Sequence, residues 1–407
     1  MDTKFTIKIS PETLRFIQIN RKENIEKLAL QDNKSPNIDL KTAITQIAGW
    51  QTAIEKIPSW ANNSNILYPQ HLSLEQCSSE ATAKYKTQLM QGESFADLTG
   101  GFGIDFSFIS QKFLTSIYVE HQQELCELAK HNFCVLKLAN INVVNDDSIS
   151  YLTDMPPVNS IYIDPARRNA NGGRIVAIAD CEPNVIDIEE LLLSKASQVL
   201  IKLSPMLDLS KALDELKNVF EAHVLSVNNE CKELLLLLHK KEDAIDTSYN
   251  IPIHCVNLQK QTTQHFVFTR KEEQESPCEY TDKIGQYLYE PNASLLKAGA
   301  FRRIAYIYNV KKLHPNSHLY TSDSLVANFP GRIFHITGHS SFNKKEIKLL
   351  LYDLKKGNLT IRNFPSSVIE LRKRINLKDG GDIYLFATQM NDGSKILIRC
   401  KKTNEHT

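Results

Sequence analysis

The sequence lacks the features of a membrane, secreted or repetitive protein. Its longest aliphatic run, Leu234 to Leu238, is far shorter than the roughly 20 apolar residues that a membrane-spanning helix needs. The eight cysteines form no CxxC pair and no zinc-finger spacing, so neither a disulfide framework nor a metal site is expected. Glycine and proline, with 15 residues each, are too scarce for a collagenous or low-complexity chain. These absences predict a globular protein of the cytoplasm, with reduced thiols, no membrane contact and no metal.

The 407 residues also carry almost no net charge, only +1, but this balance hides an asymmetry along the chain. From Phe301 onward there are 19 Lys and Arg against 8 Asp and Glu, whereas the first 300 residues carry 29 against 39. The basic residues assigned to a polyanionic substrate are Lys344, Lys345, Arg372 and Arg374. Aromatic residues interleaved with the basic clusters include Tyr306, Tyr308, Phe329, Phe334 and Phe342. This pattern is typical of a module that binds a nucleic-acid backbone, and an ordinary solvated surface is the alternative.

The chain divides into a helical start, a region of alternating strands and helices, and a strand-rich end. Apolar residues recur at helical spacing over residues 1–75, interrupted by prolines. From Ser94, seven short apolar segments have the composition of strands: 94–98, 116–120, 141–145, 159–164, 199–203, 224–227 and 234–239. Helical segments lie among them at 104–112, 122–138, 186–196 and 209–220. The alternation predicts an open α/β domain with a parallel sheet, and the short VNNECKE link predicts a last hairpin with one antiparallel edge strand.

The sharpest motif is DLTGGFGID, Asp97 to Asp105, which follows the first predicted strand and opens a helix. Its glycines let the backbone turn sharply and come close to a ligand at the carboxyl end of the sheet. A dinucleotide site wants a small residue where Phe106 stands, and the acidic residues of the loop would repel a pyrophosphate. They suit the ammonium and sulfonium groups of S-adenosylmethionine (SAM), which is therefore the expected cofactor. The loop residues assigned to it are Asp97, Thr99, Gly100, Gly101, Phe102, Gly103 and Asp105.

Further cofactor contacts are expected where neighbouring strands end. Glu120 ends the second strand, where a carboxylate can accept both ribose hydroxyls of an adenosyl group. Asp146 and Asp147 end the third strand, where an acceptor could hold the adenine amino group, although Asp147 could equally begin a turn. Gln76 and Ser79, upstream of the first strand, are assigned to the methionine end of SAM, with a helix cap at Ser78 or Ser79 as the alternative.

A second motif, IYIDPARRN, follows the fourth strand, at the position that faces the methyl group of a bound SAM. The Asp164 carboxylate and the Pro165 carbonyl can accept the N–H bonds of an acceptor nitrogen, which localises its lone pair and orients it for attack. A capped turn with exposed arginines is the alternative. Arg167 and Arg168 could bind phosphate, stack on a base, or pair with nearby acids.

Three other polar residues lie at or near strand ends and are assigned to the substrate. Lys202 stands near the end of the 199–203 strand, and Glu230 and Lys232 lie in the predicted hairpin beside the cofactor cleft. A plain turn explains the hairpin pair equally well.

Taken together, these segments resemble the bacterial class I SAM-dependent methyltransferases with a C-terminal THUMP-like domain. The similar segments are DLTGGFGID, Glu120, DPARR, IKLSP at 201–205, NECKELLLL at 229–237 and YEPNASLLKAGAF at 289–301. The resemblance covers nearly the whole chain. It implies that the helical region at 1–75 is followed by a Rossmann-like methyltransferase sheet at 76–245 and by two small α+β domains, ferredoxin-like at 281–323 and THUMP-like at 324–402. It also implies an RNA substrate, tRNA or rRNA.

One departure from the nucleic-acid methyltransferase pattern bears on the acceptor atom. Enzymes that methylate amino groups of bases commonly follow the proline turn with an aromatic residue that stacks on the flipped base, and here Arg167 holds that place. Methylation at C5 needs a cysteine nucleophile beside the reactive loop, and DPARRN and IKLSPM contain none, so Cys181 and Cys231 are expected to be core or edge thiols. The sequence favours methylation of an RNA base nitrogen, with a small-molecule methyltransferase and a non-catalytic RNA-binding protein that keeps SAM as alternatives. An oxidoreductase fits least well.

Overall fold

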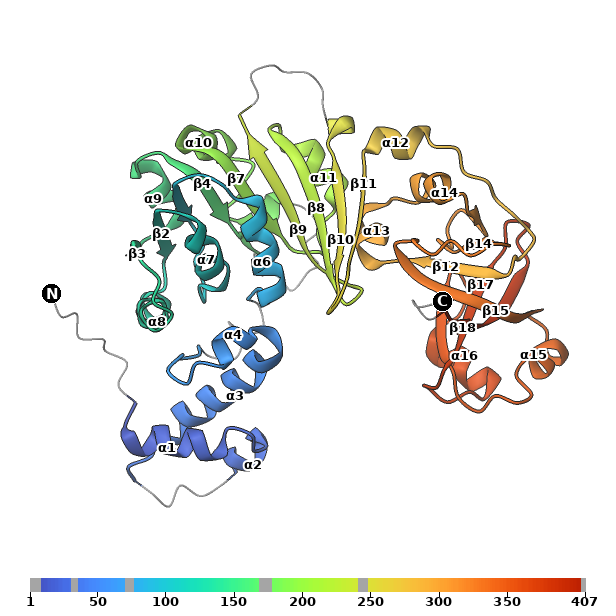
Figure 1. Cartoon of the computed structure of the whole chain (residues 1–407), viewed down its shortest axis with the longest axis horizontal. Coiled ribbons are helices and arrows are strands. Elements are labelled where there is room, and N and C mark those ends of the chain that lie inside the picture. Colours follow the sequence, from blue (N-terminus) through green and yellow to red (C-terminus); the bar gives the residue numbers. More distant parts are fainter. Residues whose placement is uncertain (1–8, 31–35, 70–76, 168–177, 241–247, 404–407) are drawn as a thin grey trace. The chain divides into compact units, whose positions relative to one another are not determined.

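The computed structural model describes residues 9–30, 36–69, 77–167, 178–240 and 248–403. Its contacts divide the chain into two compact units. Unit 1 comprises residues 1–220 and 234–244, and unit 2 comprises residues 221–233 and 245–407 (Figure 1). Within the described residues, no helix has both the length and the apolar character needed to cross a membrane.

Unit 1 begins with four short helices, which confirms the helical start: α1 (Pro11–Asn20), α2 (Ile25–Ala29), α3 (Leu40–Lys56) and α4 (Pro58–Ala61). Ser10, Asn24 and Asp39 begin the first three, because each side chain accepts a hydrogen bond from the third helical N–H. The buried Trp60 packs edge-on against Phe102, with ring centroids 5.1 Å apart. The helical region therefore supports the glycine loop.

A nine-stranded sheet carries the DLTGGFGID and DPARR motifs, with its strands in the order β11-β10-β8-β9-β7-β4-β1-β2-β3. Its strands are β1 (Ser94–Asp97), β2 (Thr115–Glu120), β3 (Ile141–Asn145), β4 (Val158–Ile163), β7 (Ala196–Leu203), β8 (Val219–Val227), β9 (Glu230–His239), β10 (Ile253–Leu258) and β11 (Thr263–Phe268). The helices along this part of the chain are α6 (Glu80–Leu89), α7 (Ile104–Ile109), α8 (Gln123–Val135), α9 (Ser148–Asp154), α10 (Glu189–Lys195) and α11 (Leu209–Glu215). Five strands, β3-β2-β1-β4-β7, pair in parallel, which confirms the predicted α/β sheet.

The expected antiparallel edge strand is wrong in its position. Strand β9 does run antiparallel to β7, but it lies between β7 and β8, and β10 and β11 extend the sheet further. The residues Leu234 to Leu238 are all buried, as expected of an internal strand that is covered on both faces. The β8–β9 turn contains Asn228 and Asn229, both with positive φ, which is the backbone of a tight type I′ hairpin.

Unit 2 contains a second sheet of seven strands, in the order β13-β14-β12-β15-β18-β17-β16. The strands are β12 (Tyr287–Pro291), β13 (Lys311–Lys312), β14 (Tyr320–Ser322), β15 (Gly331–Ser341), β16 (Asn358–Arg362), β17 (Ile383–Gln389) and β18 (Lys395–Lys402). The helices of this unit are α12 (Arg270–Glu275), α13 (Ala293–Ala298), α14 (Arg302–Tyr308), α15 (Lys344–Leu350) and α16 (Val368–Ile375).

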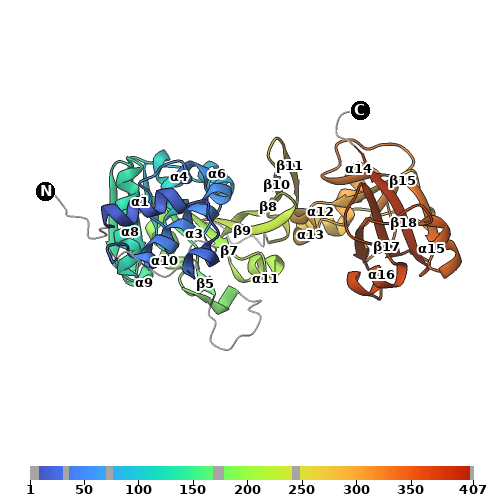
Figure 2. The ribbon, with the colours of Figure 1, turned by 90° about the horizontal axis from the view of Figure 1, so that it is seen from below.

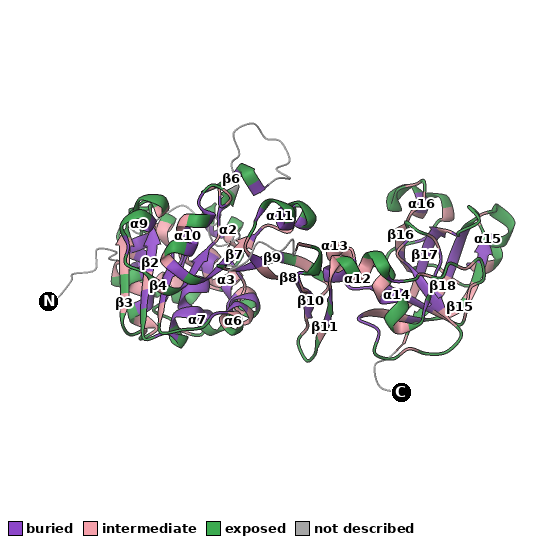
Figure 3. Ribbon diagram, turned by 90° about the horizontal axis from the view of Figure 1, so that it is seen from above, coloured by how far each residue is buried: buried purple, intermediate pink, exposed green. Residues whose placement is uncertain are grey.

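This second sheet is buried on both faces, because its apolar side chains alternate. On β17, Leu385 and Ala387 join a core with Ile347 of α15 and Leu371 of α16. Phe386 points to the opposite face and belongs to another core. Helices α15 and α16 therefore cover one face together, and Figure 3 shows buried residues along the strands and exposed ones on these helices.

Candidate active site

The glycine loop at the carboxyl end of β1 is fixed by hydrogen bonds from β2. The Gly101 N–H donates to Glu120 Oε2 at 2.9 Å, and the Tyr118 hydroxyl donates to the Gly101 carbonyl. A Cβ on Gly100 would lie 2.2 Å from the Tyr118 ring, so only glycine fits there. A Cβ on Gly101, where φ is +54°, would meet no described atom closer than 3.8 Å. The loop is thus held tightly on its inner side and leaves room for a ligand over Gly101.

Glu120 is the anchor of this loop and is almost fully buried. Its Oε1 accepts the Gln122 N–H at 2.8 Å and lies 3.0 Å from His121 Nδ1, while Oε2 accepts from Gly101. An ionised carboxylate has about four acceptor positions, so capacity remains for a ribose hydroxyl. The ribose role of Glu120 is compatible with these contacts and stays a prediction.

Asp97, the first residue of the motif, sits in a strongly electronegative environment. It is 1% exposed, and its Oδ1 accepts the Thr99 N–H at 3.0 Å. Burial raises the pKa of Asp97 well above its ordinary value, and the negative charges of Asp105, Asp164 and Glu120 raise it further. The carboxyl groups gathered around Asp97 are the feature of this site that suits a cationic ligand.

Asp105, by contrast, has its charge balanced within the protein. The fully buried Lys86 of α6 lies 2.9 Å from Asp105 Oδ1, and Oδ2 accepts hydrogen bonds from the hydroxyls of Ser78 and Tyr162 at 2.6 and 2.7 Å. Burial raises the pKa of Asp105, but Lys86 and then Lys202 outweigh it, so the pKa lies below the ordinary value. The cofactor role of Asp105 stays a prediction, and its observed contacts join α6 to α7 and β4.

The two sequence motifs meet at Thr99 and Asp164. Thr99 Oγ1 accepts the Asp164 N–H at 2.6 Å, which joins the glycine loop to the Asp-Pro turn. Asp164 Oδ2 forms an ion pair with Lys202 at the end of β7. Burial raises the pKa of Asp164, whereas the Lys202 ammonium acts in the opposite direction. The structure thus brings together Asp164 and Lys202, which the sequence analysis had assigned separately to catalysis and to substrate.

The rest of the Asp-Pro turn is held by a small separate sheet. Strand β5 (Ala166–Arg167), which is labelled in Figure 2, pairs with β6 (Cys181–Glu182), and Arg167 stands opposite Cys181. Pro165 is buried, and Cys181 is 1% exposed, as expected of a core thiol. Arg168 lies outside the described residues.

Two of the outlying cofactor candidates act as helix caps. Asp147 Oδ1 accepts the N–H groups of Ile149 and Ser150 at the start of α9, a helix that the sequence analysis missed. Ser79 caps α6 by accepting the Thr82 N–H. Asp146 lies beside Asp147, the cap of α9, and its Oδ1 accepts the Asp147 N–H. Gln76 lies outside the described residues, and all four cofactor roles stay predictions.

The hairpin pair predicted to bind substrate lies in unit 2. Lys232 Nζ is 2.6 Å from Glu230 Oε1, and both side chains are largely exposed. An exposed pair of this kind contributes little to stability, so the two residues are available for other roles. Their assignment to the substrate stays a prediction.

The basic residues of the C-terminal segment fall into two groups. Lys344 and Lys345 are exposed on α15. Arg374 of α16 is also exposed, and its guanidinium lies over the ring of Phe342, which packs against the core that α15 and α16 share. Arg372 is instead engaged by Asp379 at 2.6 Å and by the Gly357 carbonyl.

The aromatic residues near these basic clusters also differ from the sequence expectation. Phe329 and Phe334 are buried in the core and cannot stack on a base. The exposed aromatic side chains of the basic segment include Tyr306, at 53%, which the sequence analysis named, and Tyr352, at 81%, which it did not.

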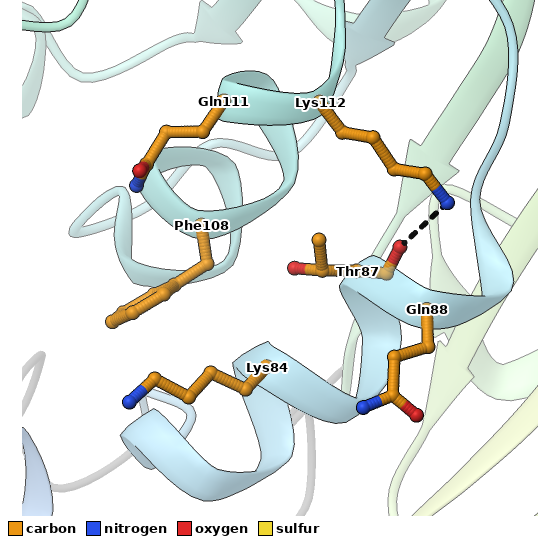
Figure 4. A pocket seen from close by; sticks show the side chains of 6 residues that line it. All are labelled: Lys84, Thr87, Gln88, Phe108, Gln111 and Lys112. Atoms are coloured by element: carbon orange, nitrogen blue, oxygen red, sulfur yellow. Dashed lines mark hydrogen bonds between the residues drawn. The ribbon is translucent and has the colours of Figure 1, made fainter.

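A surface hollow of about 500 Å³ lies apart from these motifs, between α6 and α7 (Figure 4). Its lining residues are Lys84, Thr87, Gln88, Phe108, Gln111 and Lys112. Lys112 donates to the Thr87 carbonyl across it. The lining contains two cations and no acid, so it does not suit the positively charged methionine end of SAM.

The residues at the carboxyl ends of β1, β2 and β4 do fit SAM. The open space over Gly101 lets a ligand come close to the backbone there, and the Glu120 carboxylate can still accept a further hydrogen bond. The carboxyl groups of Asp97, Asp164 and Glu120 lie near one another at these strand ends and suit the cationic groups of SAM. Parallel strands, a glycine loop and an acidic cluster of this kind define a class I SAM-dependent methyltransferase, an enzyme whose cofactor is SAM.

Comparison with known proteins places the chain within that class. The family model for a ferredoxin-like domain matches residues 287–330, and the THUMP domain-like model matches 331–402. A solved structure described as a "putative methyltransferase from Porphyromonas gingivalis W83" is 39% identical, with 97% of this chain and 98% of that chain covered and a TM-score of 0.86. The protein belongs to the same family of methyltransferases with ferredoxin-like and THUMP-like C-terminal domains.

Other comparisons add little. A search among curated proteins found no match. An rRNA methylase from Streptococcus thermophilus is 14% identical, covering 40% of this chain and 96% of that chain, with a TM-score of 0.30. SMU.1697c from Streptococcus mutans, in complex with SAH, is 14% identical, covering 40% and 97%, with a TM-score of 0.29. Likeness at this level carries no argument about substrate.

Proposed function

We propose that this methyltransferase modifies a nitrogen of an RNA base, in tRNA or rRNA, and that unit 2 holds the RNA. The observation that supports this is the coincidence of the THUMP domain-like match at 331–402 with the basic end of the chain. From Phe301 onward the chain carries 19 Lys and Arg against 8 Asp and Glu, and this excess of positive charge favours a polyanion over a small neutral substrate.

In this proposal SAM, when bound, supplies a methyl group activated by its sulfonium. The residues that would hold it are Asp97, the glycine loop and Glu120. Asp164 accepts an N–H of the acceptor nitrogen through the oxygen that does not face Lys202, and the Pro165 carbonyl accepts a second N–H. Lys202 holds the Asp164 carboxylate in place and favours its charged form. These contacts orient the nitrogen lone pair and provide an acceptor for the proton that the methylated nitrogen releases.

RNA binding is assigned to the outer surface of α15 and α16. Lys344 and Lys345 project from α15 and supply charge for phosphates, with Arg374 on α16. Tyr352, just after α15, offers an exposed ring on which a base can stack. In this proposal Tyr352 is the aromatic part of the RNA-binding surface, a role that the buried Phe329 and Phe334 are unable to fill.

The test measures methyl transfer from radiolabelled SAM to RNA, and RNA affinity over a range of salt. We expect the purified protein to label RNA from a strain that lacks the gene. The Lys344→Glu/Lys345→Glu variant should bind RNA more weakly and lower the slope of log affinity against log salt by about 1.5, the value for two lost phosphate contacts. Lys130→Glu/Lys211→Glu is the matched control, since it reverses two exposed lysines of unit 1.

The outcomes separate the alternatives. RNA affinity that hardly depends on salt, with no labelled RNA, would favour a small-molecule substrate. Tight, salt-dependent RNA binding without methyl transfer would favour a non-catalytic RNA-binding protein. Cytosine or uridine C5 is not proposed as the acceptor, because the thiol nearest the Asp-Pro turn along the β5–β6 pair, Cys181, is buried.

A further inference from the structure

Unit 2 holds a cluster of metal-ligating side chains that is separate from the methyltransferase motifs. It comes from three neighbouring strands, β8, β10 and β11. In the parallel β8–β10 pair, His254 stands directly opposite His223, and Glu221 lies two residues before His223 and so points to the same face. His265 of β11 lies next to them, diagonal to His254 in the antiparallel β10–β11 pair.

The ligand atoms are close enough to share one ion. Glu221 Oε1 lies 2.6 Å from His223 Nε2 and 3.2 Å from His254 Nε2. One ligand atom from each of these three residues lies within 4.8 Å of the others. Atoms that bind zinc at about 2.0–2.2 Å in a tetrahedron are roughly 3.4 Å apart, so small side-chain rotations would complete the geometry.

His265 supplies the support that metal-ligating histidines usually have. Its Nε2 lies 3.1 Å from Nδ1 of His254, the ring nitrogen that does not face Glu221. A hydrogen bond to the second nitrogen of a ligating imidazole fixes the ring and its tautomer. The rings of His223 and His254 are also stacked, with centroids 4.5 Å apart, which holds both edges toward Glu221.

We infer that Glu221, His223 and His254 form a binding site for a divalent transition metal, with zinc the ion best suited to two imidazoles and one carboxylate. Because His223 is buried while Glu221 and His254 are about one quarter exposed, the ion would enter from the solvent side and keep an open coordination position there. The absence of zinc-finger cysteine spacing does not bear on this site, since its ligands come from strands some 30 residues apart. The inference is independent of the proposed RNA substrate.

The competing explanation is a hydrogen-bonded chain with no ion, in which Glu221 Oε1 accepts from both imidazoles. Isothermal titration of Zn²⁺ into chelator-treated full-length protein separates the two. We expect one site, with His254→Gln and Glu221→Gln each weakening zinc binding at least tenfold and His265→Gln, which removes only the supporting contact, weakening it about 10–100-fold.

The control is His339→Gln, which removes an exposed strand histidine of β15. It leaves all eight cysteines in place, as the other variants do, so zinc binding by thiols cancels in the comparison. Circular dichroism checks that each variant is folded. Zinc binding that is equal in Glu221→Gln, His254→Gln and His339→Gln, or the absence of a stoichiometric site in the parent protein, would overturn the inference.

Discussion

The charged groups near β1 and those on α15 and α16 differ in how they are held. Near β1, Asp105 has a fully buried ammonium 2.9 Å away and two hydroxyl donors, and Asp164 pairs with Lys202. On α15, Lys344 and Lys345 are exposed. A buried charge depends on each named partner, whereas surface charges act together and are screened by salt. Single substitutions should therefore have large effects in the first region and small ones in the second.

The largest expected effect is on the chemistry at Asp164. Asp164→Asn keeps the side-chain shape but removes the charge that pairs with Lys202 and that accepts the N–H and the proton of the acceptor nitrogen. Methyl transfer to RNA should fall by about 10²–10⁴, the usual range for a positioned acid–base group. Incorporation of label from SAM at saturating RNA measures this loss.

The same variant should still bind SAM, because Asp97, the glycine loop and Glu120 are untouched. A rise in melting temperature on adding SAM, similar to that of the parent protein, is the control. Methyl transfer within a few-fold of the parent value would remove Asp164 from the mechanism. Loss of the SAM-induced shift would instead make it a cofactor residue.

The next effect in size is on stability, and α6 offers a matched pair of lysines. Lys86 is fully buried against Asp105, while Lys84, two residues earlier, is 59% exposed and pairs with Glu80 one helical turn away. Lys86→Met leaves the buried Asp105 carboxylate with only the more distant Lys202, 3.9 Å from its Oδ2, as an ionic partner, and should lower the free energy of unfolding by about 3 kcal/mol. Lys84→Met should lower it by no more than about 0.5 kcal/mol. Urea denaturation without SAM measures both, and equal losses would show that the Lys86–Asp105 pair is not a buried charge pair in solution.

Lys86 also shows what the sequence could not reveal. The DLTGGFGID and DPARR motifs can be recognised in the sequence because their glycines and proline are required by the local backbone conformation. Both motifs lie where predicted, at the ends of β1 and β4. Lys86 is one lysine in an ordinary amphipathic helix, and its burial follows only from how α6 packs. The same holds for Ser78 and Tyr162, which bind Asp105 from distant parts of the chain.

Strand order was predictable only in part, for a related reason. Alternating strands and helices require a parallel sheet, but the place of β9 depends on β8, β10 and β11 as neighbours. The histidine cluster was invisible for the same reason, since no spacing links His223 to His254. On the basic surface, sequence composition predicted the charge of the segment but could not separate exposed Lys344 from Arg372, which Asp379 engages.

The smallest expected effect separates the two regions by their response to pH. Burial, reinforced by neighbouring carboxylates, raises the pKa of Asp97, so the free protein holds a proton there to higher pH than an ordinary aspartate does. The ammonium and sulfonium of SAM lower that pKa, and binding should release up to one proton. SAM affinity should therefore rise with pH by up to about tenfold per unit below the raised pKa and level off above it.

Calorimetry in two buffers of different ionisation enthalpy counts that proton directly. Asp97→Asn should bind SAM more weakly but lose the pH dependence, whereas RNA affinity should be nearly flat over the same pH range, because ordinary lysines stay charged there, and should respond to salt instead. SAM affinity that is independent of pH between 5 and 8 would show that SAM binding releases no proton from Asp97 in this range. The contrast between the two regions would then lie in burial and in the response to salt, and not in the response to pH.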